Sequence, residues 1–229
     1  RLTDAQIREI GFPWSEAMVE RSRRSAGATI AACLSALKEG VAVNLAGGTH
    51  HAYADKGSGF CVFNDAAVAA RYVQSMSPTR VAVIDLDVHQ GNGTAQIFAH
   101  EKAVFTFSMH GQSNYPLQKE QSDLDVGLPD NCGDDYYLSE LTKHLAVIQA
   151  QFVPDFIFYQ CGVDVLAADK LGKLGLSLAG CAQRDELVFS FAQALDCPIV
   201  CTMGGGYAPE IRTIIEAHTN TFRRVQKYF

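Results

Sequence analysis

The chain has 229 residues, of which 48% are hydrophobic and 19% are charged. This composition excludes a disordered chain and allows a sizeable buried core. The formal net charge of −6 excludes a general nucleic-acid binder, and no apolar run approaches the roughly 18 residues that a membrane-spanning helix needs. We therefore expect a globular protein without direct nucleic-acid or membrane partners; its oligomeric state is left open.

Seven cysteines are spread along the chain without a CxxC pair, most of them inside apolar runs. Such positions favour buried, reduced thiols. This cysteine usage is typical of a reducing compartment. We therefore expect an intracellular, cytoplasmic protein whose cysteines carry no chemistry.

Short apolar runs rich in β-formers alternate with amphipathic stretches along the chain. Their continuous hydrophobicity is typical of strands buried on both faces. The predicted strands are Val41–Leu45, Val81–Leu86, Ala103–Ser108, Asp155–Gln160 and Pro198–Thr202. The predicted helices run from the N-cap Ser15 to Glu39, with Gly40 as the stop, and over Asp65–Ser75, Asp134–Gln151, Ala182–Leu195 and Pro209–Lys227. No repeat or linker divides them, so we expect one domain over residues 1–229. Its predicted class is α/β, a three-layer, mostly parallel sheet with helices on both faces.

A polar loop follows each predicted strand. In an open α/β sheet the carboxyl ends of the strands form the ligand crevice, so these loops are expected to meet at one edge. The active site is predicted there. The loops are Gly47-Gly48-Thr49-His50-His51, Asp87-Val88-His89-Gln90-Gly91-Asn92-Gly93, Met109-His110-Gly111, Cys161-Gly162-Val163-Asp164 and Met203-Gly204-Gly205-Gly206-Tyr207.

Asp87 and His89 form the sharpest local pattern, because residues i and i+2 of an extended strand end point to the same side. Asp164, which follows another predicted strand, is the candidate third ligand. Three oxygen and nitrogen ligands with an open position are typical of catalytic zinc sites, although Fe²⁺ and Co²⁺ suit the same donors. Asp at a strand end is often only a helix cap. Asp85 lies on the same face and, as a buried carboxylate, is expected to accept a hydrogen bond from a histidine or a backbone donor.

His50 and His51 follow two glycines, and Tyr207 follows three. Adjacent loop histidines are at least as often plain surface residues, and an isolated tyrosine of this kind is often simply buried. Hydrolysis by a metal-activated water, however, needs a base and then an acid, and imidazole fills both roles. Asp85 is expected to hold one histidine and Asn92 the other, which would separate their pKa values. A phenol at Tyr207 would stabilise a tetrahedral intermediate.

The motifs Gly-Thr-His-His, Gly-Phe-Cys-Val-Phe-Asn-Asp, Asp-Leu-Asp-Val-His-Gln-Gly-Asn-Gly, Gly-Val-Asp and Gly-Gly-Gly-Tyr occur in this order. Together they resemble the zinc-dependent histone deacetylase family, with the arginase–deacetylase fold, from about Ile10 to Tyr228. The resemblance implies Zn²⁺ on Asp87, His89 and Asp164. It also implies His51 as general base and then acid, His50 as its electrostatic partner, and Tyr207 as oxyanion donor.

The resemblance further implies residues that bind the substrate and a structural K⁺. Gly59 would offer its carbonyl to the scissile amide N–H, and Phe60 would form one wall of an acyl-lysine tunnel. Tyr115 would form the opposite wall, and Gly205 is also expected to bind the substrate. The K⁺ would use the backbone of Asp85, Asp87, His89 and Met109 with the Ser108 side chain.

Three departures from the family pattern stand out. Asn92 replaces a common Asp, and Gln90 replaces a common second His, a form that resembles the class IV branch and its bacterial-type relatives. The first departure weakens the anionic support of His51. The family's N-terminal segment, which supplies the first strand and part of the pocket rim, is expected to be absent before the helix at Ser15.

These observations predict a metal-dependent amidohydrolase that removes an acyl group, in the first place acetyl, from lysine side chains of proteins or from lysine-like amines. One alternative is an acetylpolyamine or long-chain fatty-acyl-lysine deacylase, a choice on which Tyr115 and the loop Gly111–Leu128 bear. An arginase-like ureohydrolase would need two bridged metals and more carboxylates. A catalytically inactive scaffold that binds acyl-lysine is a further alternative, although every residue that the mechanism requires is present.

Overall fold

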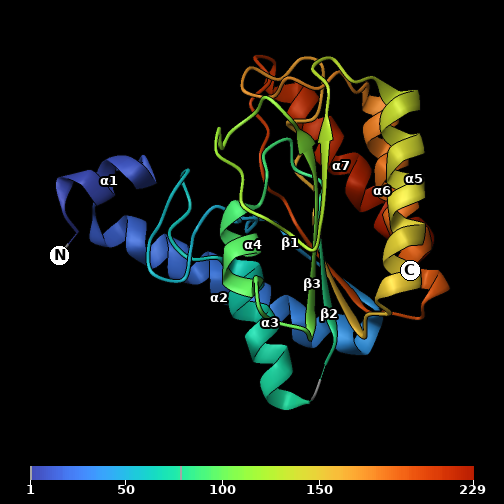
Figure 1. Ribbon diagram of the computed structural model, residues 1–229, viewed down its shortest axis with the longest axis horizontal. Helices are drawn as coiled ribbons and strands as arrows, with labels where there is room; N and C mark the ends of the chain where they lie inside the picture. The colour runs from blue at the N-terminus through green and yellow to red at the C-terminus, as the bar shows by residue number, and fades with distance from the viewer. Residues whose placement is uncertain (1, 78) are drawn as a thin grey trace.

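Six parallel strands form the central sheet of the computed structural model, which describes residues 2–77 and 79–229 (Figure 1). Hydrogen-bonded neighbours follow the order β1-β6-β5-β2-β3-β4. The strands are β1 (Val41–Asn44), β2 (Val81–Asp85), β3 (Val104–Gly111), β4 (Leu124–Leu128), β5 (Phe156–Gln160) and β6 (Ile199–Thr202). All the strand pairs are parallel, which confirms the predicted sheet.

Helices cover both faces of this sheet. Helices α2 (Glu16–Glu39), α3 (Asp65–Met76) and α4 (Asn92–Phe98) pack on one face, and α5 (Asp134–Gln151), α6 (Leu178–Ala194) and α7 (Ile211–Tyr228) lie on the other (Figure 1). Strand β2 divides its side chains between two apolar cores: Val81 and Val83 face the first helix layer, and Ala82 and Ile84 face the second. Both faces are therefore apolar, which explains the unbroken hydrophobic runs in the sequence.

Local capping sets the ends of several helices. The Ser15 hydroxyl accepts a hydrogen bond from the Met18 N–H at 3.1 Å, and Gly40 ends α2 at φ +81°, as predicted. Helix α6 begins at Leu178 rather than at the predicted Ala182, because Ser177 caps it. Helix α7 begins at Ile211, after the cap Glu210, rather than at Pro209.

Three elements escaped the sequence prediction: α1 (Asp4–Ile10), α4 and β4. Helices α1 and α4 have seven residues each, too short for a clear apolar period. The edge strand β4 alternates half-buried with exposed residues, so it contains no continuous apolar run. Two segments predicted as loops are regular structure instead: Asn92-Gly93 begins α4 after the N-cap Gly91, and Met109-His110-Gly111 ends β3.

The parallel arrangement brings the carboxyl ends of all the strands to one edge, and the polar loops that follow them meet there. One cavity of about 780 Å³ at this edge is lined by residues that follow β1, β2, β5 and β6. Among the described helices, none is both long enough and apolar enough to cross a membrane. The cavity lies at the sheet edge where the sequence predicts the active site.

Candidate metal centre and active site

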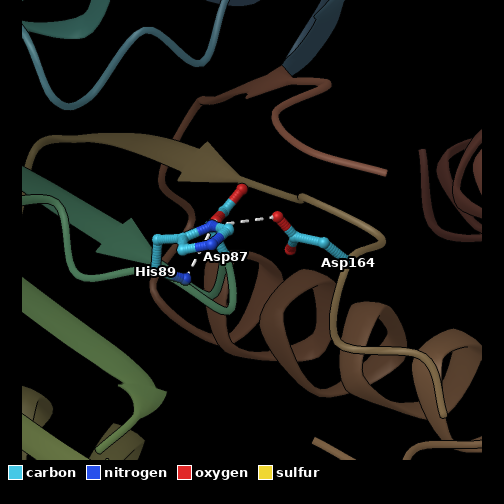
Figure 2. Close-up of side chains that lie close together, drawn as sticks. All are labelled: Asp87, His89 and Asp164. Atoms are coloured by element: carbon cyan, nitrogen blue, oxygen red, sulfur yellow. Dashed lines mark hydrogen bonds and ion pairs between the residues drawn. The ribbon is translucent and has the colours of Figure 1, made fainter. Parts of the chain in front are cut away.

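Asp87, His89 and Asp164 converge at this edge from two neighbouring strands (Figure 2). Asp87 and His89 follow β2, and Asp164 follows β5, which pairs with β2. One ligand atom from each residue lies within 4.8 Å of the others. The His89 Nδ1 lies 3.0 Å from Asp87 Oδ1 and 3.3 Å from Asp164 Oδ2. The donors thus form the open set of one nitrogen and two carboxylates expected for a catalytic metal.

Backbone N–H groups hold both carboxylates in place. The Val88 N–H donates to Asp164 Oδ1 at 3.0 Å, and the Gly205 N–H donates to Asp87 Oδ2, also at 3.0 Å. A Cβ at Gly205 would lie 2.0 Å from Asp164 Oδ2, so only glycine permits this approach. Gly205 therefore supports a candidate metal ligand as well as lining the cavity.

Asp164 Oδ2 is fully buried and has no hydrogen-bond partner in the part of the chain that the structure describes. Burial and the nearby Asp87 raise the pKa of Asp164 to about 7. Although burial opposes it, the interactions with Asp164 and Asp87 raise the pKa of His89 to about 10. Asp164 Oδ2 thus has the His89 imidazole as an ion-pair neighbour but accepts no hydrogen bond from any described residue. A buried carboxylate oxygen without a hydrogen bond is costly, and a divalent cation between these three residues would satisfy it. The residues present therefore fit a bound metal ion.

The two histidines lie beside this cluster, each held by a different partner. His50 Nδ1 lies 2.6 Å from Asp85 Oδ2, and His51 Nδ1 lies 2.6 Å from Asn92 Oδ1. Both expected contacts are present, and the ring centroids of the histidines are 4.0 Å apart. Both histidines line the cavity.

The two partners separate the pKa values of the histidines. Although burial opposes protonation, the carboxylates of Asp85 and Asp87 raise the pKa of His50 to about 9. Burial and the charge of His50 hold the pKa of His51 well below its usual range. His50 is thus the charged member of the pair at neutral pH, and His51 is neutral and can accept a proton.

Asn64 and Asp65, which sequence reasoning did not assign to the site, fix the loop that carries the histidines. The Asn64 side-chain amide donates to the backbone carbonyls of Ala52, at 3.2 Å, and His50, at 3.4 Å. The buried Asp65 carboxylate accepts the backbone N–H groups of Gly48 and Thr49. The signal in the sequence was the polar pair at the start of the helix predicted over Asp65–Ser75, where Asn64 is the N-cap.

The aromatic candidates line the cavity in different ways. The Tyr115 ring meets the His51 ring edge-on, with centroids 4.9 Å apart, and its hydroxyl lies 2.8 Å from Ser58 Oγ. Phe60 packs against Phe12, with centroids 5.2 Å apart. Burial and the negative charge of the metal-ligand candidates raise the pKa of Tyr207 to about 12, so its phenol keeps its proton at neutral pH.

Gly59 is the remaining substrate-binding candidate. It adopts φ +52°, and a Cβ there would lie 2.7 Å from the His51 ring. The backbone can therefore approach this histidine closely only because residue 59 is glycine. Gly59, like Phe60 and Tyr115, contributes to the lining of the cavity.

The residues predicted to hold K⁺ lie on β2, on the adjoining β3 and in the loop after β2. Ser108 is the register partner of Asp85, and its hydroxyl lies 2.9 Å from His110 Nδ1. Met109 is fully buried. Asp85 Oδ1 accepts the Asp87 N–H at 3.2 Å. The K⁺ assignment itself stays a prediction.

Arg184 on α6 contacts the loops that carry the candidate metal ligands and was not singled out from the sequence. It is fully buried. Its guanidinium donates to the backbone carbonyls of Gly162, at 2.6 Å, and Leu86, at 3.3 Å, and it pairs with Asp185 at 2.9 Å. These carbonyls flank the loops that carry Asp164 and Asp87. Arg184 thus links the two strand ends from which the candidate ligands project.

A parallel sheet whose carboxyl edge holds an Asp-His-Asp cluster beside two buried histidines is the arrangement of the arginase–deacetylase class. The structure is similar to that of a histone deacetylase homologue from Aquifex aeolicus, with a TM-score of 0.83 and 26% identity over 98% of this chain and 68% of that chain. It is also similar to an acetylpolyamine aminohydrolase from Burkholderia pseudomallei, with a TM-score of 0.73 and 27% identity over 87% of this chain and 60% of that one.

The sequence comparisons agree with the structural ones. The model of the histone deacetylase domain matches residues 3–222, and the chain therefore belongs to the histone deacetylase family. It is 45% identical to an uncharacterized protein of Picosynechococcus sp. over all of this chain and 76% of that protein. It is 34% identical to histone deacetylase 2 of Arabidopsis thaliana over 84% of this chain, spanning about half (51%) of the relative.

Proposed function

We propose that this chain carries the catalytic centre of a metal-dependent amidohydrolase that removes acetyl groups from lysine side chains or lysine-like amines. The observation that carries the proposal is the cluster of Asp87, His89 and Asp164, in which the buried Asp164 Oδ2 accepts no hydrogen bond within residues 2–77 and 79–229. Beside this cluster lie two histidines whose pKa values are shifted in opposite directions. Membership of the histone deacetylase family supports the same reaction.

The residues Asp87, His89 and Asp164 would hold the ion, and Zn²⁺ suits their donors. When bound, such an ion would polarise the substrate carbonyl and lower the pKa of water, so that water could give up a proton and act as a nucleophile at neutral pH. His51 takes up the proton of the attacking water and returns it to the leaving amine. The positive charge of His50 disfavours a second charge on the pair and so makes His51 a ready proton donor.

The remaining residues orient the substrate and stabilise the negative charge that develops on its carbonyl oxygen. The Tyr207 phenol donates a hydrogen bond to the carbonyl oxygen as it becomes negative. The Gly59 carbonyl accepts the amide N–H. Phe60 and Tyr115 bound an apolar passage for the aliphatic part of a lysine-like amine.

The test replaces His51 with Ala and Tyr207 with Phe in the metal-loaded protein. With an acetyl-lysine peptide we expect kcat to fall about 10²–10⁴-fold in H51A and about 10²–10³-fold in Y207F. Circular dichroism and metal content serve as controls for folding and loading. Undiminished turnover in both variants would rule out this mechanism.

A second candidate substrate class is the acetylated polyamines, because one similar structure is an acetylpolyamine aminohydrolase. Acetyl-lysine peptides, acetylated polyamines and fatty-acyl peptides assayed side by side separate these classes by kcat/KM. Tight binding of acetyl-lysine without turnover of any of them would instead favour a scaffold.

A further inference from the structure

A chain of hydrogen bonds leads from His51 to a carboxylate outside the metal centre. His51 Nδ1 lies 2.6 Å from Asn92 Oδ1, and Asn92 Nδ2 donates to the Tyr53 hydroxyl at 2.9 Å. The Tyr53 hydroxyl then donates to Glu120 Oε1 at 3.1 Å. Asn92 is buried, and Tyr53 and Glu120 are half-buried, so the chain runs from the cavity toward the surface.

The direction of these hydrogen bonds depends on Glu120, the last group in the series. A carboxylate only accepts hydrogen bonds, so Tyr53 must give its proton to Glu120. The phenol oxygen is then left to accept the Asn92 amide N–H, which turns Asn92 Oδ1 toward His51. A carbonyl oxygen accepts only, so Nδ1 of neutral His51 carries the proton. Its Nε2 is consequently the unprotonated atom, as a general base requires.

The reverse direction would disable the histidine as a base. If Tyr53 donated to Asn92, the amide would be turned so that its NH₂ group faced His51 Nδ1. The imidazole proton would then reside on Nε2. Asn92 can adopt either orientation because its amide carries both donors and an acceptor. An aspartate in its place would not need a further group to choose the orientation.

Neighbouring contacts hold Glu120 and Tyr53 in this arrangement. The Gln90 side chain donates to the Glu120 backbone carbonyl at 2.7 Å and accepts the Glu120 N–H at 2.9 Å. The Lys56 ammonium lies 4.7 Å from the centre of the Tyr53 ring. Gln90, which immediately follows His89 and departs from the family pattern, thus anchors the segment that carries Glu120.

We propose that Glu120, acting through Tyr53 and Asn92, is a positioning residue that holds His51 in the Nδ1–H tautomer. The inference rests on the proposed function in one respect, the role of His51 as base. The inference also explains why the two departures from the family pattern occur together. Asn92 lacks the carboxylate that an Asp at this position would provide, and Gln90 holds Glu120, whose carboxylate orients His51 instead.

The experiment reads the tautomer directly, without relying on turnover. Two-bond ¹H–¹⁵N correlation spectra of the full chain at pH 8, with and without Zn²⁺, report which His51 nitrogen carries the proton. The H51Q variant assigns the signal. The variants are E120Q, which keeps the shape of the side chain but can donate, and Y53F, which removes the link. E39Q, a change at an exposed glutamate at the end of α2, is the matched control.

We expect the Nδ1–H form to predominate in the wild-type protein and in E39Q. In E120Q and Y53F the ratio of the two tautomers should fall about tenfold or more, and kcat should fall by a similar factor with little change in KM. An unchanged tautomer ratio in both variants would overturn the inference. A shifted ratio in a protein that hydrolyses no acylated amine would support the positioning role while contradicting the proposed function.

Discussion

Nδ1 of His89 lies 3.3 Å from Oδ2 of Asp164, although one residue follows β2 and the other follows β5. The two strands are register neighbours in the sheet, which brings both strand ends to the same place. The two atoms form an ion pair but no hydrogen bond, so the buried Asp164 carboxylate is incompletely satisfied.

Replacing Asp164 with Asn should weaken Zn²⁺ binding at least about 100-fold, because the amide removes a negative charge from the ligand set. Competition with a chromophoric chelator measures the affinity, and elemental analysis measures the bound ion. A chelator should likewise abolish turnover by the wild-type chain, and added Zn²⁺ should restore it. D135N, at an exposed position at the start of α5, is the control. Wild-type affinity in D164N would contradict the assignment of this ligand.

Replacing Asn64 tests the support of the histidine loop. N64A removes both the cap of α3 and the donors to the carbonyls of His50 and Ala52. We expect a loss of about 1–2 kcal/mol in unfolding free energy and a roughly tenfold lower kcat. N64S keeps a capping oxygen, so urea denaturation should show part of the stability restored. Its kcat should remain low, because serine does not reach both carbonyls; recovery of kcat in N64S would show that only the cap matters.

Arg184 and Asp185 form a fully buried ion pair. R184M should lower the unfolding free energy by about 3–5 kcal/mol, because it leaves the Asp185 carboxylate buried without its counter-charge. The double variant R184M/D185N should recover part of this loss, which urea denaturation of both single variants and the double variant measures as a coupling energy. Strictly additive losses would show that the two charges do not interact.

His218 on α7 provides a pH-dependent prediction away from the metal centre. Burial and the charge of Arg184 lower the pKa of His218 to about 4. The unfolded chain therefore binds a proton near pH 6.5 that the folded chain takes up only near pH 4, so stability falls as the pH drops through this window. We expect the stability difference between wild type and H218Q to change by about 3 kcal/mol between pH 7 and pH 4. Parallel pH dependences of the two unfolding free energies would contradict this prediction.

Every strand except β4, every helix except α1 and α4, and the residues that meet at the carboxyl edge of the sheet could be predicted from the sequence. Buried parallel strands require continuous apolar runs, and helix ends require caps such as Ser15 and Gly40. These signals are local, so they can be read without coordinates. The edge strand β4 escaped because an exposed edge needs no such run.

The contacts that hold the site together could not be predicted from the sequence. Three residues make these contacts with groups far away in the sequence. Asn64 donates to the loop that carries the histidines, Arg184 donates to the loop that carries Asp164, and Glu120 accepts the last hydrogen bond of the chain that starts at His51. Whether a buried polar group finds a donor or an acceptor depends on which segments fold against it. The residue types alone do not contain that information, because the same amide or carboxylate could equally well form hydrogen bonds with water on the surface.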